Sequence, residues 1–192
     1  MHRQPLLNLL RRHQPADAHE AAMTQETIAF VEQHPDCFER SLLIGHVTGS
    51  AWIVSPNRDR VVLIHHRKLD RWLQPGGHAD GDPDIAAVAL REAREETGLT
   101  SLRLLDGTGT TLAKTDQPPA IFDVDVHRIP ARGTIPQHLH YDIRFLLEAE
   151  PTEPFGFSSE VKNSCWVLTD KTNEYTNEES IRRMAGKTLK IS

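Results

Sequence analysis

Cysteine and long apolar runs are both scarce in this chain. The only cysteines, Cys37 and Cys165, are far apart and match neither a zinc-binding nor a disulfide spacing, which favours reduced thiols and a cytoplasmic protein. Residues 1–14 have no signal-peptide core or cleavage site. A membrane-spanning helix needs about 20 apolar residues, and no run in the chain approaches that length. We therefore expect no membrane partner.

An excess of positive charge is also missing. The chain has 22 Lys and Arg against 27 Asp and Glu, for a net charge of −5. Such a balance provides no basic surface for a nucleic-acid backbone, so we expect no nucleic-acid partner. An acidic protein that handles phosphate groups would need a cation between itself and its ligand.

The length of 192 residues, 38% of them apolar, suits one compact domain with an appended element. Residues 1–40 are expected to be a helical extension, with one helix around residues 6–10 and a second between Pro15 and Pro35. The domain proper is expected over residues 41–192. Within it, strands are predicted at 52–54, 61–64, 102–113, 120–128, 138–148 and 161–168, and helices at 83–97 and 176–186. This alternation predicts an α/β fold.

The helix at 83–97 has clear start and stop signals. Asp82 is expected to cap it, Pro83 suits its first position, and Gly98 is expected to end it. At about 100° per residue, one arc of this helix can pack on a sheet and consists of Ala86, Ala89, Leu90 and Ala93. The neighbouring arc carries Glu92, Glu95 and Glu96, at spacings i, i+3 and i+4.

Carboxylates at these spacings repel one another by a few tenths of a kcal/mol per pair. A hard divalent cation, which binds several carboxylate oxygens together, would make the cluster favourable. The alternative is an ordinary solvated acidic face.

The stretch GGHADGDPDIAAVALREAREETGL, residues 76–99, resembles the motif of the Nudix (MutT-like) hydrolases. Required residues stand at Gly77, Arg91, Glu92, Glu95, Glu96, Gly98 and Leu99, and Ala93 replaces an aliphatic residue. The resemblance implies a Nudix-type α/β/α sandwich with a mixed sheet. One position departs: the family's first glutamate falls on Pro83, and Asp82 or Asp84 is expected to reach Arg91 in its place.

The resemblance also implies a chemistry, the Mg²⁺- or Mn²⁺-dependent hydrolysis of a pyrophosphate bond in a nucleoside diphosphate-linked small molecule. Glu92, Glu95, Glu96 and the Gly76 carbonyl would then hold the ions, and Arg91 would orient Glu92. The base would be a motif glutamate such as Glu95, or a residue on a distant loop. Our loop candidate is Glu160, for which the alternative is an ordinary solvent-facing residue.

Two predicted strands alternate polar and apolar residues. His138, His140 and Asp142 share one face of the first, and Asp123, Asp125 and His127 share one face of the second. If the strands pair, these faces form one patch, which is either exposed sheet or a wall that binds the substrate. We expect His138, His140, Asp142 and Asp125 to contact the substrate. A metal site of His138, His140 and an aspartate is a weaker alternative.

The role of Trp72 and the reaction class each have more than one interpretation. Trp72 is expected either to stack on a base or to pack beside the Pro-Gly-Gly turn. A Nudix-fold nucleotide-binding or sensor module without catalysis is a rival function, and the intact glutamates argue against it. Diphosphate isomerisation would need an active cysteine, and the sequence around Cys37 and Cys165 does not support that role for either. The extension could cover the sheet edge, complete a homodimer or cap the cleft.

Overall fold

The computed structural model describes residues 2–106, 119–156 and 158–191 of the chain. In chain order the elements are α1 (Gln4–Arg12), α2 (Ala18–Gln33), β1 (Gly45–Val54), β2 (Arg60–His66), β3 (Arg71–Leu73), β4 (Gly76–His78), α3 (Ile85–Thr97), β5 (Arg103–Leu104), β6 (Ile121–Ile129), β7 (His138–Glu148), β8 (Val161–Leu168), the 3₁₀ helix η1 (Thr169–Glu174) and α4 (Glu179–Thr188). None of the described helices is both long and apolar enough to cross a bilayer.

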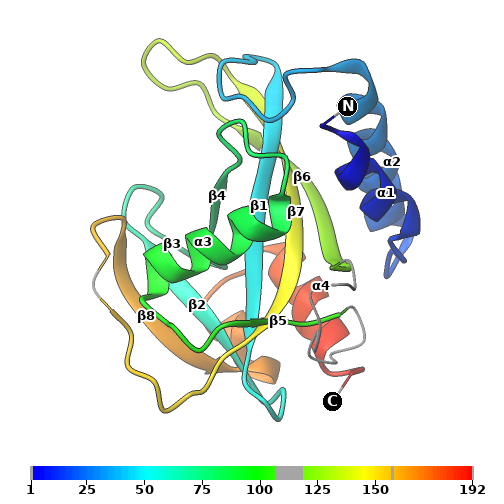
Figure 1. Ribbon diagram of the computed structural model, residues 1–192. Coiled ribbons are helices and arrows are strands. Elements are labelled where there is room, and N and C mark those ends of the chain that lie inside the picture. The colour runs from blue at the N-terminus through cyan, green and yellow to red at the C-terminus, as the bar shows by residue number, and fades with distance from the viewer. Residues whose placement is uncertain (1, 107–118, 157, 192) are drawn as a thin grey trace.

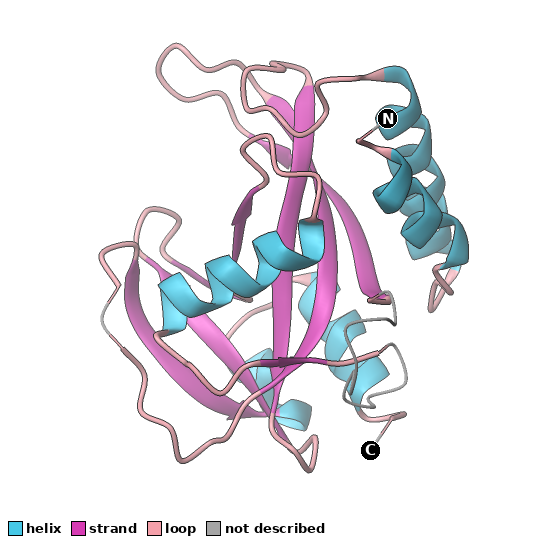
Figure 2. Cartoon of the chain, in the orientation of Figure 1, coloured by secondary structure: helices cyan, strands magenta, loops and turns pink. Residues whose placement is uncertain are grey.

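The eight strands within the described residues belong to one mixed sheet built around β1 and β7, which run parallel (Figures 1 and 2). Their register pairs Gly45 with Leu139 and Val54 with Glu148 along the whole length of β1. β7 also pairs antiparallel with β5 and β6, while β1 pairs antiparallel with β2 and β4. β3 and β8 extend the sheet beyond β2.

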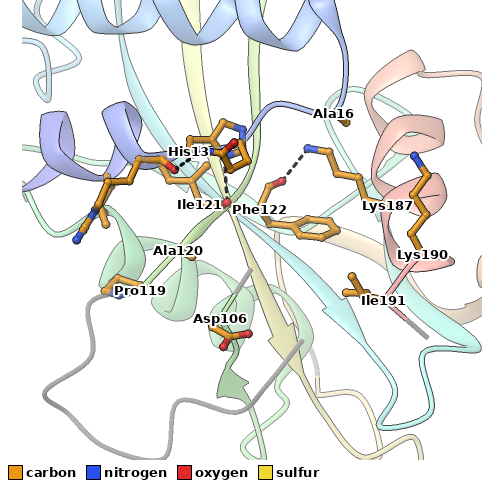
Figure 3. A pocket seen from close by; sticks show the side chains of 13 residues that line it. His13, Ala16, Asp106, Pro119, Ala120, Ile121, Phe122, Lys187, Lys190 and Ile191 are labelled. Atoms are coloured by element: carbon orange, nitrogen blue, oxygen red, sulfur yellow. Dashed lines mark hydrogen bonds between the residues drawn. The ribbon is translucent and has the colours of Figure 1, made fainter. Parts of the chain in front are cut away.

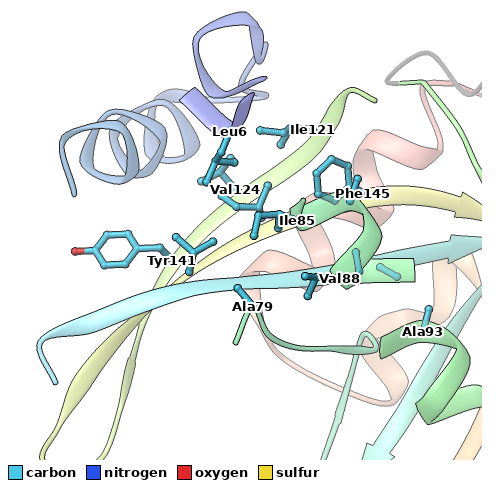
Figure 4. Packing of buried hydrophobic residues seen from close by; sticks show 14 of the residues in the cluster. Leu6, Ala79, Ile85, Val88, Ala93, Ile121, Val124, Tyr141 and Phe145 are labelled. Atoms are coloured by element: carbon cyan, nitrogen blue, oxygen red, sulfur yellow. The ribbon is translucent and has the colours of Figure 1, made fainter. Parts of the chain in front are cut away.

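Helix α3 crosses one face of this sheet, because alternate residues of β1 on that side are apolar or glycine. Val47, Ala51 and Ile53 are fully buried there, with Val88 and Ala89 of the helix in the same cluster. Figure 4 shows side chains of this cluster meeting from α3, β6 and β7. Burying such side chains is worth roughly 1.5–3 kcal/mol for each large aliphatic residue.

Helix α4 covers the opposite face near the end of β1. Trp52 is fully buried in a second apolar cluster with Ile181 and Met184 of α4. Its indole Nε1 donates a 2.8 Å hydrogen bond to Thr188 Oγ1. The sheet therefore lies between α3 and α4, and the predicted α/β/α sandwich with a mixed sheet is confirmed.

The N-terminal helices pack on each other and on the edge strand β6 (Figure 1). Asp17 caps α2 by accepting a 2.8 Å hydrogen bond from the Glu20 amide. The buried side chains of Leu6, Leu10 and Phe30 join the apolar cluster under α3. The ring of Phe30 stacks on that of Tyr141 at a centroid distance of 3.9 Å. The extension thus shares a core with the sheet.

Buried charges connect the two ends of the chain behind β6. Glu20 of α2 is fully buried, and its carboxylate accepts hydrogen bonds from Lys187 Nζ of α4 at 2.6 Å and from the Val124 amide at 3.2 Å. Lys187 Nζ also lies 2.8 Å from Asp123 Oδ1. Charge that is removed from water must be paired in this way, or it costs several kcal/mol.

A cavity of about 640 Å³ opens between the α1–α2 turn, the start of β6 and the end of α4. Figure 3 shows two of the side chains at its edge in hydrogen bonds with main-chain carbonyls of β6. His13 Nδ1 lies 3.1 Å from the Ile121 oxygen, and Lys187 Nζ donates to the Phe122 oxygen at 2.7 Å. These bonds hold β6 to both terminal segments.

Most predicted elements are present, and the differences are local. The capping prediction at Asp82 and Pro83 was wrong, because α3 begins at Ile85 and its N-cap is Asp84, whose Oδ1 accepts from the Ala87 amide at 3.1 Å. Two short strands, β3 and β4, were not predicted. Of the strand predicted at 102–113, β5 contains two residues, and the part from 107 onward lies outside the described residues.

We predict that Glu20→Gln destabilises the protein at neutral pH. Burial alone would raise the pKa of Glu20, but hydrogen bonds from His13, the Ala16 amide and Lys187 outweigh burial and lower this pKa from 4.5 to about 2. The corresponding stabilisation is present above pH 4.5 and is lost as the pH falls toward 2. Urea unfolding at pH 7 should show a loss of about 3 kcal/mol.

The gap between wild type and Glu20→Gln should close as the pH is lowered from 4.5. Glu26→Gln, on an exposed part of α2, is the matched control and should change stability by less than about 0.5 kcal/mol. Equal stability of Glu20→Gln and wild type at pH 7 would contradict the pairing.

Candidate functional site

The three glutamates of α3 project from the C-terminal half of this helix, which Gly98 ends in the left-handed conformation at φ 71°. Their exposures differ greatly. The Glu95 side chain is 62% exposed and that of Glu92 is 18% exposed, whereas Glu96 is buried. The three carboxylates therefore lie in different environments, from solvent at Glu95 to the protein interior at Glu96.

Gly76 and Gly77 allow β4 to lie directly against these carboxylates. A Cβ on Gly77 would fall 2.4 Å from Glu92 Oε2, and a Cβ on Gly76 would fall 2.1 Å from Ser50 Oγ. The Gly76 amide donates a 2.9 Å hydrogen bond to Glu96 Oε2. No other residue type fits this approach without displacing its neighbour.

Arg91 lies beside Glu92, as the motif predicts. Its Nη2 donates to Glu92 Oε1 at 3.0 Å and to the His78 carbonyl oxygen at 3.2 Å. The expectation that Asp82 or Asp84 would pair with Arg91 was wrong within the described ranges: Asp84 caps α3 and Asp82 Oδ1 accepts from the Asp84 amide. Both carboxylates serve the turn that enters the helix.

The loop before β8 closes a cleft over α3. This cleft has a volume of about 410 Å³ and is lined by Glu92, Glu95, Glu96, Ser158, Ser159 and Glu160. The loop is held by Arg67, whose main-chain amide donates to the Glu160 oxygen at 2.9 Å and whose Nε donates to the Ser159 oxygen at 2.9 Å. The structure thus brings Glu160 together with the motif glutamates, although Glu160 is 64 positions after Glu96 in the chain.

His66 lies beside this cleft and was not among the predicted site residues. One ring nitrogen of His66 and one carboxylate oxygen each of Glu96 and Glu160 lie within 4.8 Å of one another. His66 ends β2 directly after His65, and histidines at a strand end carry no specific sequence signal for such a site. Its position follows from the pairing of β2 with β8, in which His66 is opposite Val161.

The carboxylates of the cleft repel one another. Burial raises the pKa of Glu96 to about 8, and the charges of Glu92, Glu160 and Glu95 add to this effect. Burial also raises the pKa of Glu92, against the hydrogen bond from Arg91. A divalent cation among these oxygens would remove the repulsion and favour the ionised carboxylates.

The predicted polar patch on β6 and β7 is present as neighbouring side chains, but much of it is buried. Asp142 is 2% exposed, and its Oδ1 accepts hydrogen bonds from Thr48 at 2.9 Å and Ser50 at 2.7 Å. Its Oδ2 accepts from Arg144 Nε at 2.7 Å and lies 3.3 Å from Gln74 Nε2. Asp142 therefore holds Gln74, which comes two residues before the glycine pair in the chain.

Asp125 lies in the same patch and is mostly buried. Burial would raise its pKa, but Arg144, His127 and Arg183 outweigh burial and hold the pKa well below the usual value. Asp125 Oδ2 lies 3.2 Å from Arg144 Nη2 and 3.0 Å from His127 Nδ1. This carboxylate is thus ionised and committed to cationic neighbours.

His138 and His140 lie with other histidines at the far end of the patch. The ring centroid of His140 is 4.8 Å from that of His46 and 5.0 Å from that of His78. Burial, with the neighbouring imidazoles, lowers the pKa of His140 to about 2. His140 is therefore neutral at pH 7.

Trp72 of β3 stacks on the His65 ring at 5.0 Å and meets the Tyr175 ring edge-on at 5.3 Å. It is half-buried and packs against the cluster under α4.

The two cysteines are free thiols, and burial raises the pKa of each to about 11. Neither supplies a thiolate at neutral pH.

Comparison with known proteins identifies a NUDIX domain over residues 46–185. Solved structures with a similar fold include an Ap4A hydrolase of C. elegans in a binary complex, which is 16% identical with a TM-score of 0.54 over 75% of this chain and 95% of that one. A NUDIX-family hydrolase of Clostridium perfringens is 20% identical with a TM-score of 0.52 over 77% and 98% of the two chains. The E. coli dihydroneopterin triphosphate pyrophosphohydrolase is 15% identical with a TM-score of 0.52 over 75% and 95%. No curated protein sequence gives a significant match.

We predict different effects of alanine at the two glycines of β4. Gly76→Ala would place a methyl group 2.9 Å from the Ser50 Cα, so thermal unfolding should show a loss of about 2 kcal/mol. Gly77→Ala meets only the carboxylate end of Glu92, which can rotate away, and should cost much less stability. Gly186→Ala on α4, with open space around it, is the control and should be neutral or stabilising. Equal losses at Gly76 and Gly77 would contradict this packing.

Proposed function

This chain belongs to the Nudix family, and from that premise we propose that it is a divalent-metal-dependent hydrolase that cleaves a pyrophosphate bond in a nucleoside diphosphate-linked small molecule. The observation that carries the proposal is the cleft of about 410 Å³ in which the three glutamates of α3 face Glu160. A phosphate-handling cleft lined by carboxylates needs cations, because both sides carry negative charge.

The residues fit Mg²⁺ or Mn²⁺. The donor set consists of carboxylate oxygens and a main-chain carbonyl, which hard divalent cations prefer, and Glu96 is a buried carboxylate whose charge is otherwise opposed by its neighbours. We propose Glu92, Glu95, Glu96 and the Gly76 carbonyl as ligands. When bound, such ions neutralise the pyrophosphate charge and lower the pKa of a coordinated water.

The chain's own residues position the reacting groups. Arg91 holds Glu92 through the 3.0 Å contact between them, and we propose that this keeps the Glu92 carboxylate aimed at the ions. Glu160, on the loop opposite α3, is our candidate base, which would take the proton of the attacking water. Glu95 is the other candidate, since its carboxylate is the most exposed of the three motif glutamates.

For the substrate we propose that the patch on β6 and β7 forms the binding wall. His138 and His140 would contact the ligand, and Asp142 and Asp125 would act through the side chains that they hold in place. Trp72, next to Gln74, would stack on a base. The Ap4A and dihydroneopterin triphosphate named for the structural neighbours are suitable members of a test panel.

We also propose that residues 41–192 form the Nudix domain and residues 1–40 its extension, which covers the sheet edge at β6. A cytoplasmic location agrees with the two free thiols.

A non-catalytic nucleotide sensor remains the rival function. Release of phosphate or nucleoside monophosphate from a panel of nucleotides, with and without Mg²⁺ or Mn²⁺, tests the proposal directly. Tight binding of a nucleotide without product release would favour the sensor.

We predict that Glu95→Gln and Glu96→Gln each lower kcat by about 100-fold or more, since even an outer-shell partner of a metal is worth 10–100-fold. The fold should survive, because Gln keeps the shape of Glu. Mn²⁺ affinity, measured by titration calorimetry, should fall in parallel. Glu26→Gln is the control and should behave as wild type. Unaltered kinetics in both motif variants would contradict the assignment of the metal site.

We predict that Glu160→Gln lowers kcat while leaving Mn²⁺ affinity within a few-fold of wild type, because a base acts on the water rather than on the ions. The neighbouring change Ser159→Ala controls for disturbance of the loop. If Glu160→Gln keeps full activity, the base is a motif glutamate and Glu160 is an ordinary solvent-facing residue.

A further inference from the structure

Histidines from three neighbouring strands meet at the end of the sheet near the start of β1. His46 is the direct partner of His140 in the β1–β7 ladder, and His78 is brought to them by the pairing of β4 with β1. The three ring centroids are 4.8 to 5.0 Å apart. They form a nearly regular triangle that the carboxylate cleft does not use.

Ring nitrogens from all three histidines converge. One nitrogen from each of His46, His78 and His140 lies within 4.8 Å of the other two. His46 is 4% exposed, and among the described residues neither of its ring nitrogens has a hydrogen bond of acceptable geometry, nor has Nε2 of His140. Burial and the neighbouring His138 lower the pKa of His46, against a weak contact with the Leu42 carbonyl that is not a well-formed hydrogen bond. A buried nitrogen left unpaired costs about 1–3 kcal/mol.

The surroundings favour a metal ion over an anion in this triangle. Three imidazoles this close repel one another when protonated, so the neutral forms, each with a lone pair, are favoured. Neutral imidazole is a metal ligand, whereas an anion would need protonated rings.

A hydrogen bond to the main chain holds one further imidazole, that of His138, beside the triangle. His138 Nδ1 lies 2.9 Å from the Pro136 carbonyl oxygen, which can only accept, so Nδ1 is the donor and Nε2 is the nitrogen left to bind a metal. The His138 ring lies 5.0 Å from that of His46 and 5.3 Å from that of His140. A histidine that binds a metal through one ring nitrogen typically donates a hydrogen bond from the other nitrogen to a carbonyl or carboxylate, which fixes the ring.

We propose that His46, His78 and His140 form a second metal site, for zinc or a similar transition metal, with His138 placed as the fourth ligand. Imidazole donors favour such ions, while the carboxylate cleft suits Mg²⁺ or Mn²⁺. With Zn–N bonds of about 2.1 Å the nitrogens must approach to roughly 3.4 Å. Rotation of the rings about their side-chain bonds can supply that closure.

The site would tie three strands together at one point. β4 carries Gly76 and Gly77 next to the motif glutamates and is only three residues long. An ion bound through His78 would fix β4 against β1 and β7. This inference does not rest on the proposed hydrolysis, and it replaces the direct substrate contacts proposed for His138 and His140.

The test is a Zn²⁺ titration of the chelator-treated full chain by calorimetry, with Mg²⁺ at saturation to occupy the carboxylates. Wild type should bind Zn²⁺, and its melting temperature should rise on addition of Zn²⁺. His140→Ala and His78→Ala should each weaken binding by more than roughly 10-fold, the least that loss of an outer-shell partner costs. His19→Ala, an exposed position on α2, should bind as wild type. Circular dichroism checks that each variant is folded. If His140→Ala or His78→Ala does not fold, His138→Ala is tested in its place.

Two outcomes would overturn the site. One is Zn²⁺ binding that survives the histidine variants and disappears in Glu96→Gln, which would place the ion in the carboxylate cleft. The other is a raised KM in His140→Ala with no Zn²⁺ bound by wild type, which would return His140 to the substrate wall. If nucleotide hydrolysis is absent but Zn²⁺ binding follows the histidines, the proposed function fails and the metal site stands.

Discussion

Arg144 is buried in the middle of the sheet, and much of the structure is arranged around its charge. Its guanidinium lies 3.1 Å from Asp123, 3.2 Å from Asp125 and 2.7 Å from Asp142. Leaving such a cation unpaired would cost several kcal/mol, so the three aspartates are required wherever this arginine is buried. Asp123 in turn binds Arg183 of α4 at 2.8 Å, and Asp142 reaches Gln74 beside the glycine pair.

The need to pair the buried charge of Arg144 connects regions of the protein that have different roles. From Asp123 the charges continue through Lys187 to Glu20, and so to the N-terminal helices. From Asp142 the network continues through a hydrogen bond to Gln74, which precedes the glycine pair of β4. The helical extension and the candidate site are therefore attached to one network of buried polar and charged groups.

Local sequence signals predicted the parts of the structure that depend on local geometry. The i, i+3, i+4 spacing of Glu92, Glu95 and Glu96 and the stop at Gly98 follow from helix geometry and appear as expected. The alternation in β7 predicted which residues share a face, but not that Asp142 and Arg144 would be buried. Alternation reports a polar face, and only the opposing α4 and β6 decide whether that face meets water or countercharges. His46 and His66 gave no signal, because their neighbours in space come from distant strands.

The parallel ladder between β1 and β7 has a consequence for the order of folding. Residues 45–54 must pair with residues 139–148, a separation of about 90 positions, and such non-local pairing slows folding. During synthesis the motif helix, Ile85–Thr97, is made before β7, His138–Glu148. Its apolar face must wait for the central strand pair to close, which makes this helix a natural binding place for chaperones in the nascent chain.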